Sequence, residues 1–399
     1  MITALALDEA GFGVPRTLDD LRTYLQAAME VEHLTIPVYM TGMYTIRPGT
    51  NRTSYYAIRA VLLEEMLHMT LAANLLNAVG GTPKVGTGFV AKYPARLPFS
   101  GETVPGIGLQ HFSPEALRTF LRIEQPEAIT PAEPGSGWTS IGQFYDTIRA
   151  GLEYLIATLG HDAVFAGGKP GHQVGPEDFY NSGGEVFKID GRNSALEALE
   201  TITEQGEGVH DSIWNSNDRF GEQPELAHYF RFNEIYTGRS YSPDDRPQDQ
   251  PSGPLIDVTW DDAYPIHGDS KVADYRRFAG TSAVYEQAVA FNSRYAVLLR
   301  YLDSAFNGRP RHMALAVPTM LELRDRAGQL YRNPHPDPAL AARGRFASAT
   351  FEIARPQFDA ADEEIARTAG IDGALPPRLG QGQETEGQDS GLEGCSGVR

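Results

Sequence analysis

The sequence predicts a mainly α-helical protein whose centre is a bundle of four helices. Apolar residues recur at intervals of three or four over several long stretches, which is the spacing of one helix face. Segments that contain Gly and Pro separate these stretches and mark helix ends. Glutamates and histidines also fall on the apolar faces of the expected helices, and this indicates what the bundle holds.

Two long helices are expected to form an N-terminal hairpin. The first begins at the Thr and Asp caps within residues 17–20 and ends at Pro48 and Gly49. The second begins near residue 53 and ends at residues 80–83, which read Gly-Gly-Thr-Pro. The short turn between these helices predicts that they run antiparallel and pack against each other.

Two further helices are expected after a Gly- and Pro-rich insertion at about residues 84–190. The insertion itself contains shorter helices, one after a Ser-Pro-Glu cap at 113–115 and one at about 140–159. The third bundle helix is expected at 190–211, and the fourth at 224–237 with Pro in its first turn.

Additional helices are expected after the bundle, at about 273–306 and 310–331. We therefore divide the chain into a metal-binding bundle at 1–272, helices at 273–355 that pack on it, and a disordered tail at 374–399. The tail is low in apolar residues.

Composition limits the classes of function. The 399 residues carry a formal net charge of −18, which opposes binding to nucleic acid or to an anionic membrane surface. No apolar run approaches the length needed to span a bilayer, and we expect a cytoplasmic protein. Cys395 is the single cysteine, so any metal site must use oxygen and imidazole ligands.

Glu32, Glu65 and His68 are the first candidate metal ligands. Glu65 and His68 lie three residues apart on the apolar face of the second helix, and Glu32 lies on that of the first. Glu32 precedes Pro48 by 16 residues and Glu65 follows Gly49 by 16, so antiparallel helices place them at the same height. Unpaired carboxylates in an apolar core are unfavourable, and a divalent cation between them supplies the missing positive charge.

Glu207, Glu225 and His228 repeat these residue types in the second half of the chain. Glu207 is favoured over Glu204 on the third helix, although the flanking glycines blur the helical phase. Glu225 and His228 form a second Glu-x-x-His, but an acidic residue after Pro224 is also explained by the helix dipole alone. The six residues together match the carboxylate-bridged dimetal proteins of ferritin-like fold, whose ligands suit iron or manganese.

Residues 29–37 (MEVEHLTIP) and 64–69 (EEMLHM) resemble the ferritin-like domain of iminophenyl-pyruvate dimer synthases. The match continues at 71–81, 139–145, 205–208 and 225–232, and it spans roughly residues 18 to 355. That family includes enzymes of the violacein and indolocarbazole pathways, which couple two arylpyruvate imines oxidatively and have been associated with haem. They are much longer than this chain. The resemblance implies that the set of Glu and His residues carries over better than the coupling activity or the haem.

The sequence leads to one main hypothesis and two alternatives. The main one is an oxidoreductase of specialised metabolism with one or two iron-type ions that activate O2 or peroxide on a small, amino-acid-derived substrate. The runner-up reaction is oxidative coupling of arylpyruvate imines. A ferritin-like protein that handles iron or peroxide, and a non-catalytic protein, are the alternatives from other classes. The oligomeric state and the identity of catalytic residues stay open.

Overall fold

The structure is a computed structural model that describes residues 12–102, 104, 106–129, 137–179, 186–209, 212–215 and 224–368. These residues form helices, loops and isolated β-bridges, and no β-strand occurs among them. The predicted tail at 374–399, with Cys395, lies outside them. No helix within the described ranges is both long and apolar enough to cross a membrane.

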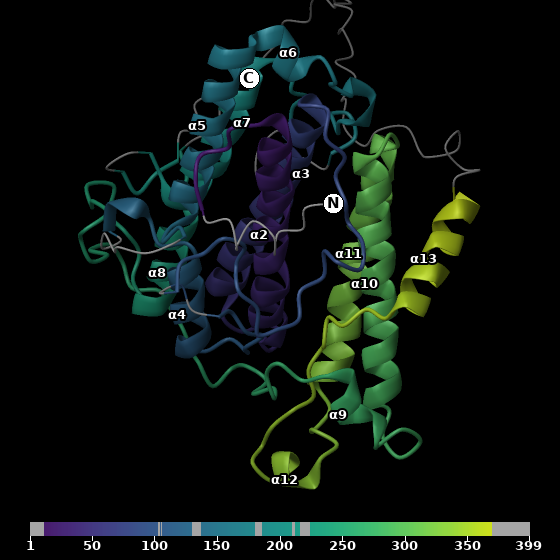
Figure 1. Cartoon of the computed structure of the whole chain (residues 1–399). Coiled ribbons are helices and arrows are strands. Elements are labelled where there is room, and N and C mark those ends of the chain that lie inside the picture. The colour runs from purple at the N-terminus through teal and green to yellow at the C-terminus, as the bar shows by residue number, and fades with distance from the viewer. Residues whose placement is uncertain are drawn as a thin grey trace, which may run out of the picture.

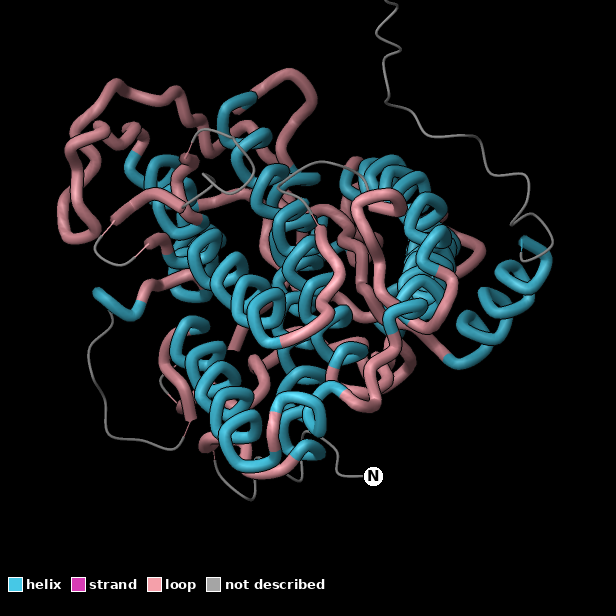
Figure 2. The backbone as a smooth tube through the Cα atoms, turned by 90° about the horizontal axis from the view of Figure 1, so that it is seen from above, coloured by secondary structure: helices cyan, strands magenta, loops and turns pink. Residues whose placement is uncertain are grey.

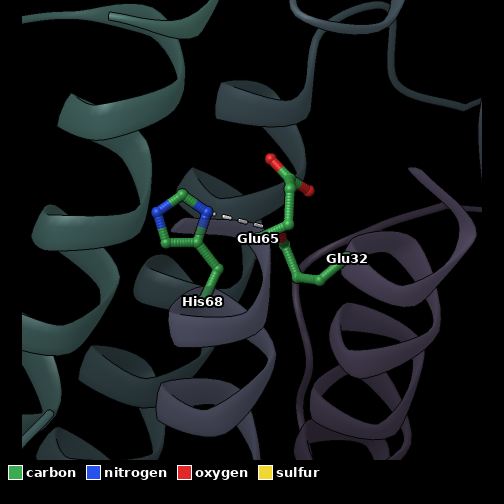
Figure 3. Close-up of side chains that lie close together, drawn as sticks. All are labelled: Glu32, Glu65 and His68. Atoms are coloured by element: carbon green, nitrogen blue, oxygen red, sulfur yellow. Dashed lines mark ion pairs between the residues drawn. The ribbon is translucent and has the colours of Figure 1, made fainter. Parts of the chain in front are cut away.

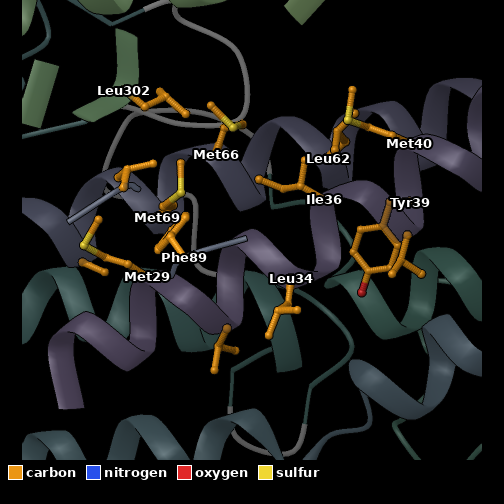
Figure 4. Packing of buried hydrophobic residues seen from close by; sticks show 14 of the residues in the cluster. Met29, Leu34, Ile36, Tyr39, Met40, Leu62, Met66, Met69, Phe89 and Leu302 are labelled. Atoms are coloured by element: carbon orange, nitrogen blue, oxygen red, sulfur yellow. The ribbon is translucent and has the colours of Figure 1, made fainter. Parts of the chain in front are cut away.

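Two antiparallel helices form the centre of the molecule, α2 (Leu18–Thr45) and α3 (Arg52–Ala78), as the sequence predicts. The Thr17 side chain accepts a hydrogen bond from the backbone N–H of Asp20, and the Asp20 carboxylate accepts one from Thr17, which fixes the start of α2. Large apolar side chains fill the space around this hairpin, among them Met66, Met69 and Phe89 (Figure 4).

Four shorter helices complete the bundle on one side of the hairpin (Figure 1). They are α4 (Pro114–Ile123), α5 (Ile141–Leu159), α7 (Arg192–Glu207) and α8 (His228–Thr237). The α5–α7 pair packs beside one end of α2 and α3, and the α4–α8 pair packs beside the other. Beside α2 the bundle is completed by α5 and α4, and beside α3 by α7 and α8. Each of these two sides is therefore interrupted between its two helices.

Additional helices cover the opposite side of the hairpin (Figures 1 and 2). The helices α10 (Val284–Phe306) and α11 (Met313–Tyr331) form an antiparallel pair that contacts α3 and α2, and α13 (Arg355–Thr368) packs on α10. Short helices α6 (His161–Phe165), α9 (Val272–Arg276) and α12 (Pro338–Ala341) lie in the connections. The mainly helical fold class is confirmed.

Four predicted boundaries differ from the structure. The helix expected at 190–211 ends at Glu207, because Gly208 takes a positive φ and ends the helix. The helix expected at 224–237 begins at His228, because the residues before it are extended and pair with the segment around Ile213. The helix expected at 273–306 is two helices, α9 and α10. The last described helix, α13, begins at residue 355, where the predicted helical region ends. The proposed division at residue 272 stays a prediction.

Candidate metal centre

Glu32, Glu65 and His68 converge between α2 and α3. Figure 3 shows the Glu32 side chain extending from α2 towards the two residues on α3. The Nδ1 atom of His68 lies 3.4 Å from Oε2 of Glu32, and all three residues are at most 3% exposed. One ligand atom from each lies within 4.8 Å of the others, close enough for all three to bind one cation.

A second group of three shares Glu65 with the first. The Nδ1 atom of His228 lies 3.1 Å from Oε1 of Glu65 and 3.5 Å from Oε2 of Glu124. These three residues are also buried, and their ligand atoms again lie within 4.8 Å of one another. Glu124 follows the last residue of α4, and His228 is the first residue of α8, so the second group is built from helix ends.

Both histidines turn Nδ1 towards carboxylates of the cluster, His68 towards Glu32 and His228 towards Glu65 and Glu124. Nε2 of His68 lies 2.8 Å from Oε1 of Gln205, and Nε2 of His228 lies 2.8 Å from Oε2 of Glu64. An oxygen that accepts from the remote nitrogen fixes the tautomer, and it leaves the Nδ1 lone pair free to bind a metal. Nδ1 of His228 is buried and, despite its nearby carboxylates, has no aligned hydrogen-bond partner, as expected for a ligand atom.

Hydroxyl groups hold the three carboxylates in place. Tyr145 donates a hydrogen bond to Oε1 of Glu32, and Tyr39 donates one to Oε1 of Glu124. The Thr35 hydroxyl lies 2.6 Å from Oε2 of Glu65 and 2.7 Å from a backbone carbonyl of its own helix. The two outer glutamates therefore have matching phenol partners, while the shared glutamate has an aliphatic hydroxyl.

The electrostatics of the cluster favour a bound cation. Burial, together with the negative charges of Glu124 and Glu32, raises the pKa of Glu65 to about 8. Burial lowers the pKa of His68 and of His228, but the adjacent carboxylates outweigh it and hold both values above the ordinary one. Carboxylate oxygens and imidazole nitrogens in a dry interior are a donor set that suits iron or manganese, so these residues fit such ions.

Comparisons with known proteins identify the family. A sequence model described as ferritin-like matches residues 25–237, which include every residue of the cluster and more than half of the chain. The chain belongs to the ferritin-like family. Dichlorochromopyrrolate synthase from Lentzea aerocolonigenes is 24% identical over 275 residues, which are 64% of this chain and 25% of that protein. The chain thus spans about a quarter of the length of this curated relative.

The fold of this ferritin-like chain also matches a solved structure. A ferritin-like protein from Caulobacter vibrioides superposes with a TM-score of 0.52 at 23% identity, over 80% of this chain and 97% of the other. The likeness supports the fold alone. Together with the relative above, it bears out the ferritin-like part of the resemblance to iminophenyl-pyruvate dimer synthases.

Glu207 lies apart from the cluster of this ferritin-like chain, although the sequence favours it as a ligand. Its carboxylate lies at the start of α5, where it accepts hydrogen bonds from the backbone N–H groups of Gly142 at 2.6 Å and Glu127 at 2.9 Å. A side chain at Gly142 would place its Cβ 2.6 Å from this carboxylate, so a larger residue there would displace the carboxylate from these hydrogen bonds. Glu207 therefore caps a helix N-terminus, and Gln205 of the same helix faces His68.

Glu225 also lies outside the cluster. It precedes α8 in the extended segment, so the three-residue spacing to His228 does not place both side chains on one helix face. Its carboxylate is 55% exposed and pairs with Arg231 at 2.8 Å. Of the six candidates, the structure brings together Glu32, Glu65, His68 and His228.

The sequence reasoning missed Glu124 as a cluster residue. Glu124 follows Ile123, the last buried apolar residue of α4, and that position next to an apolar stripe was the available signal. Glu64 lies next to Glu65 on α3, and it is buried against His228. Gln205 carries no charge and offered no signal of its own.

Proposed function

We propose that this ferritin-like protein is a non-haem oxidoreductase with two iron-type ions that activates O2 or peroxide on a small organic substrate. The observation that carries the proposal is that Glu65 belongs to two buried groups of three ligands. A shared carboxylate with one further Glu and one His on each side is the arrangement that holds two adjacent metal ions.

Each part of the cluster has a distinct role in this proposal. Glu32 and His68 hold one ion, Glu124 and His228 hold the second, and Glu65 faces both. When bound, two such ions share the electrons needed to reduce O2. The phenols of Tyr39 and Tyr145 orient the outer carboxylates, and the apolar surroundings exclude water from them.

The substrate class rests on the family resemblance and on the relative. Dichlorochromopyrrolate synthase is a biosynthetic enzyme by name, and its match with this chain supports a biosynthetic role. The proposed role in specialised metabolism on an amino-acid-derived substrate comes from the resemblance to iminophenyl-pyruvate dimer synthases. Oxidative coupling of arylpyruvate imines is the runner-up reaction, since the chain spans only a quarter of the length of that enzyme.

The structure also has a cleft of about 390 Å³ beside α8, lined by Tyr229, Asn233 and Tyr241 among others. None of the cluster residues lines this cleft.

The test is a metal count with matched variants. The metal-free protein is reconstituted anaerobically with Fe(II), desalted and analysed, and two irons per chain are expected. Glu124→Gln is expected to lose one iron, whereas Glu207→Gln retains both because its carboxylate caps α5. Loss of iron from Glu207→Gln with full retention by Glu124→Gln contradicts the proposed ligand set. The absence of bound metal in the wild type contradicts the function itself.

A second measurement separates an oxidoreductase from a protein that only handles iron. Oxygen consumption by the reconstituted protein is measured with and without aromatic amino acids and their 2-oxo acids. Catalytic consumption that depends on such a compound supports the proposal. Consumption that stops once the bound Fe(II) is oxidised, with every compound tested, favours iron handling.

A further inference from the structure

The two halves of the cluster differ in the group behind each histidine. Nδ1 of His68 lies 3.4 Å from Glu32 and Nδ1 of His228 lies 3.1 Å from Glu65, and the remote nitrogens of both rings have partners at the same distance of 2.8 Å. Behind His68 this partner is the neutral amide oxygen of Gln205, whereas behind His228 it is a carboxylate oxygen of Glu64.

Glu64 is held as a buried member of an ion-pair network. Its second oxygen, Oε1, lies 3.0 Å from Nη1 of Arg231, and both side chains are at most 8% exposed. Arg231 also donates to the carbonyl of Leu226 and pairs with the exposed Glu225. Arg231 therefore balances the charge of Glu64 through one oxygen and leaves the other beside His228.

We propose that Glu64 makes the two metal positions unequal, so that the ions bind in a fixed order. The ion beside His228 and Glu124 binds first and more tightly, and the ion beside His68 binds second. This inference rests on the proposed function, because it requires that the cluster holds two ions.

The physical reason lies in the basicity of the coordinating nitrogen. A carboxylate that accepts the remote N–H of an imidazole makes the ring a stronger electron donor than a neutral amide does. Removal of such a partner typically weakens metal binding by about 10- to 100-fold. We expect the two dissociation constants to differ by a factor of this size, with Glu64 and Gln205 acting as positioning residues.

The experiment is an anaerobic titration of the metal-free protein with Co(II) against a competing chelator, followed by the visible absorption of the bound ion. The wild type is expected to bind in two steps whose dissociation constants differ by about 10-fold or more. Glu64→Gln is expected to weaken the tight step alone, and Gln205→Leu the loose step alone. Glu363→Gln is the control, and it leaves both steps unchanged because the residue is exposed on α13 and lies outside the Glu64–Arg231 network.

Glu64→Gln leaves Arg231 buried without its main partner, so Glu64→Gln with Arg231→Met is the second variant if the first does not fold. Two equal steps in the wild type overturn the inference while the proposed dimetal function stands. Equal weakening of both steps by Glu64→Gln overturns it as well. The absence of Co(II) binding in the wild type contradicts the proposed function and the inference together.

Discussion

Replacement of Glu65 by Gln is expected to stabilise the metal-free protein. Burial and the charges of Glu124 and Glu32 raise the pKa of Glu65 to about 8 in the folded state, from 4.5 for an ordinary Glu. Because the folded-state pKa is raised, the unfolded chain loses this proton at lower pH than the folded chain does. The contribution of Glu65 to stability is thus complete below about pH 4.5 and is lost as the pH rises towards 8.

The magnitude follows from the width of that pH range. At pH 7 the unfavourable contribution of Glu65 is on the order of 3 kcal/mol, and at pH 5 it is on the order of 1 kcal/mol. The Gln side chain keeps an oxygen that accepts from Thr35 and has no charge to bury. The free energy of unfolding of metal-free Glu65→Gln is therefore expected to exceed that of the wild type at pH 7 by this amount.

The assay is equilibrium urea denaturation of chelator-treated protein at pH 5, 7 and 8. Glu363→Gln is the matched control, since a substitution at this exposed position on α13 changes stability by no more than about 0.5 kcal/mol. Added Fe(II) is expected to stabilise the wild type and not Glu65→Gln. A metal-free wild type that is as stable as Glu65→Gln at pH 8 refutes the reasoning. Such a result means that burial and the neighbouring carboxylates do not destabilise the ionised form of Glu65.

Three further predictions follow from other groups. Binding of Fe(II) at pH 7 releases at least one proton, from Glu65, and this is measured by calorimetry in two buffers of different ionisation enthalpy. Burial raises the pKa of Glu207 to about 7, so its contribution to stability is lost between about pH 4.5 and 7, and Glu207→Gln flattens that part of the stability profile. Tyr145→Phe removes the phenol beside Glu32, and we expect it to weaken the looser metal step about tenfold in the Co(II) titration while the tighter step is kept.

The first half of the cluster could be predicted because it lies on continuous helices. Helical periodicity places Glu65 and His68 on one face of α3, and the symmetric distance from the turn places Glu32 opposite them. Both rules need only the positions of residues within two uninterrupted helices. The convergence of these three side chains in the structure agrees with them.

The second half could not be predicted by the same rules, because the bundle is interrupted at the height of the cluster. His228 begins α8 and Glu124 follows α4, so the loops that join the helices decide where these side chains lie. Glu225 has the right spacing from His228 but lies in extended chain, where a three-residue step turns the side chain away. A spacing of three residues places two side chains on the same face only where those residues form a helix.

The interruption also explains how one cluster obtains two unlike halves. Side chains within α2 and α3 are fixed by their own helices, and Glu32 and His68 are further oriented by single hydrogen bonds with Tyr145 and Gln205. A residue at a helix end lacks part of that support. The buried Glu64–Arg231 pair supplies it for His228, since it connects the imidazole to the carbonyl of Leu226 and thereby to the extended segment that leads into α8. The group that orients this ligand is therefore also the group that distinguishes it electrostatically from the other.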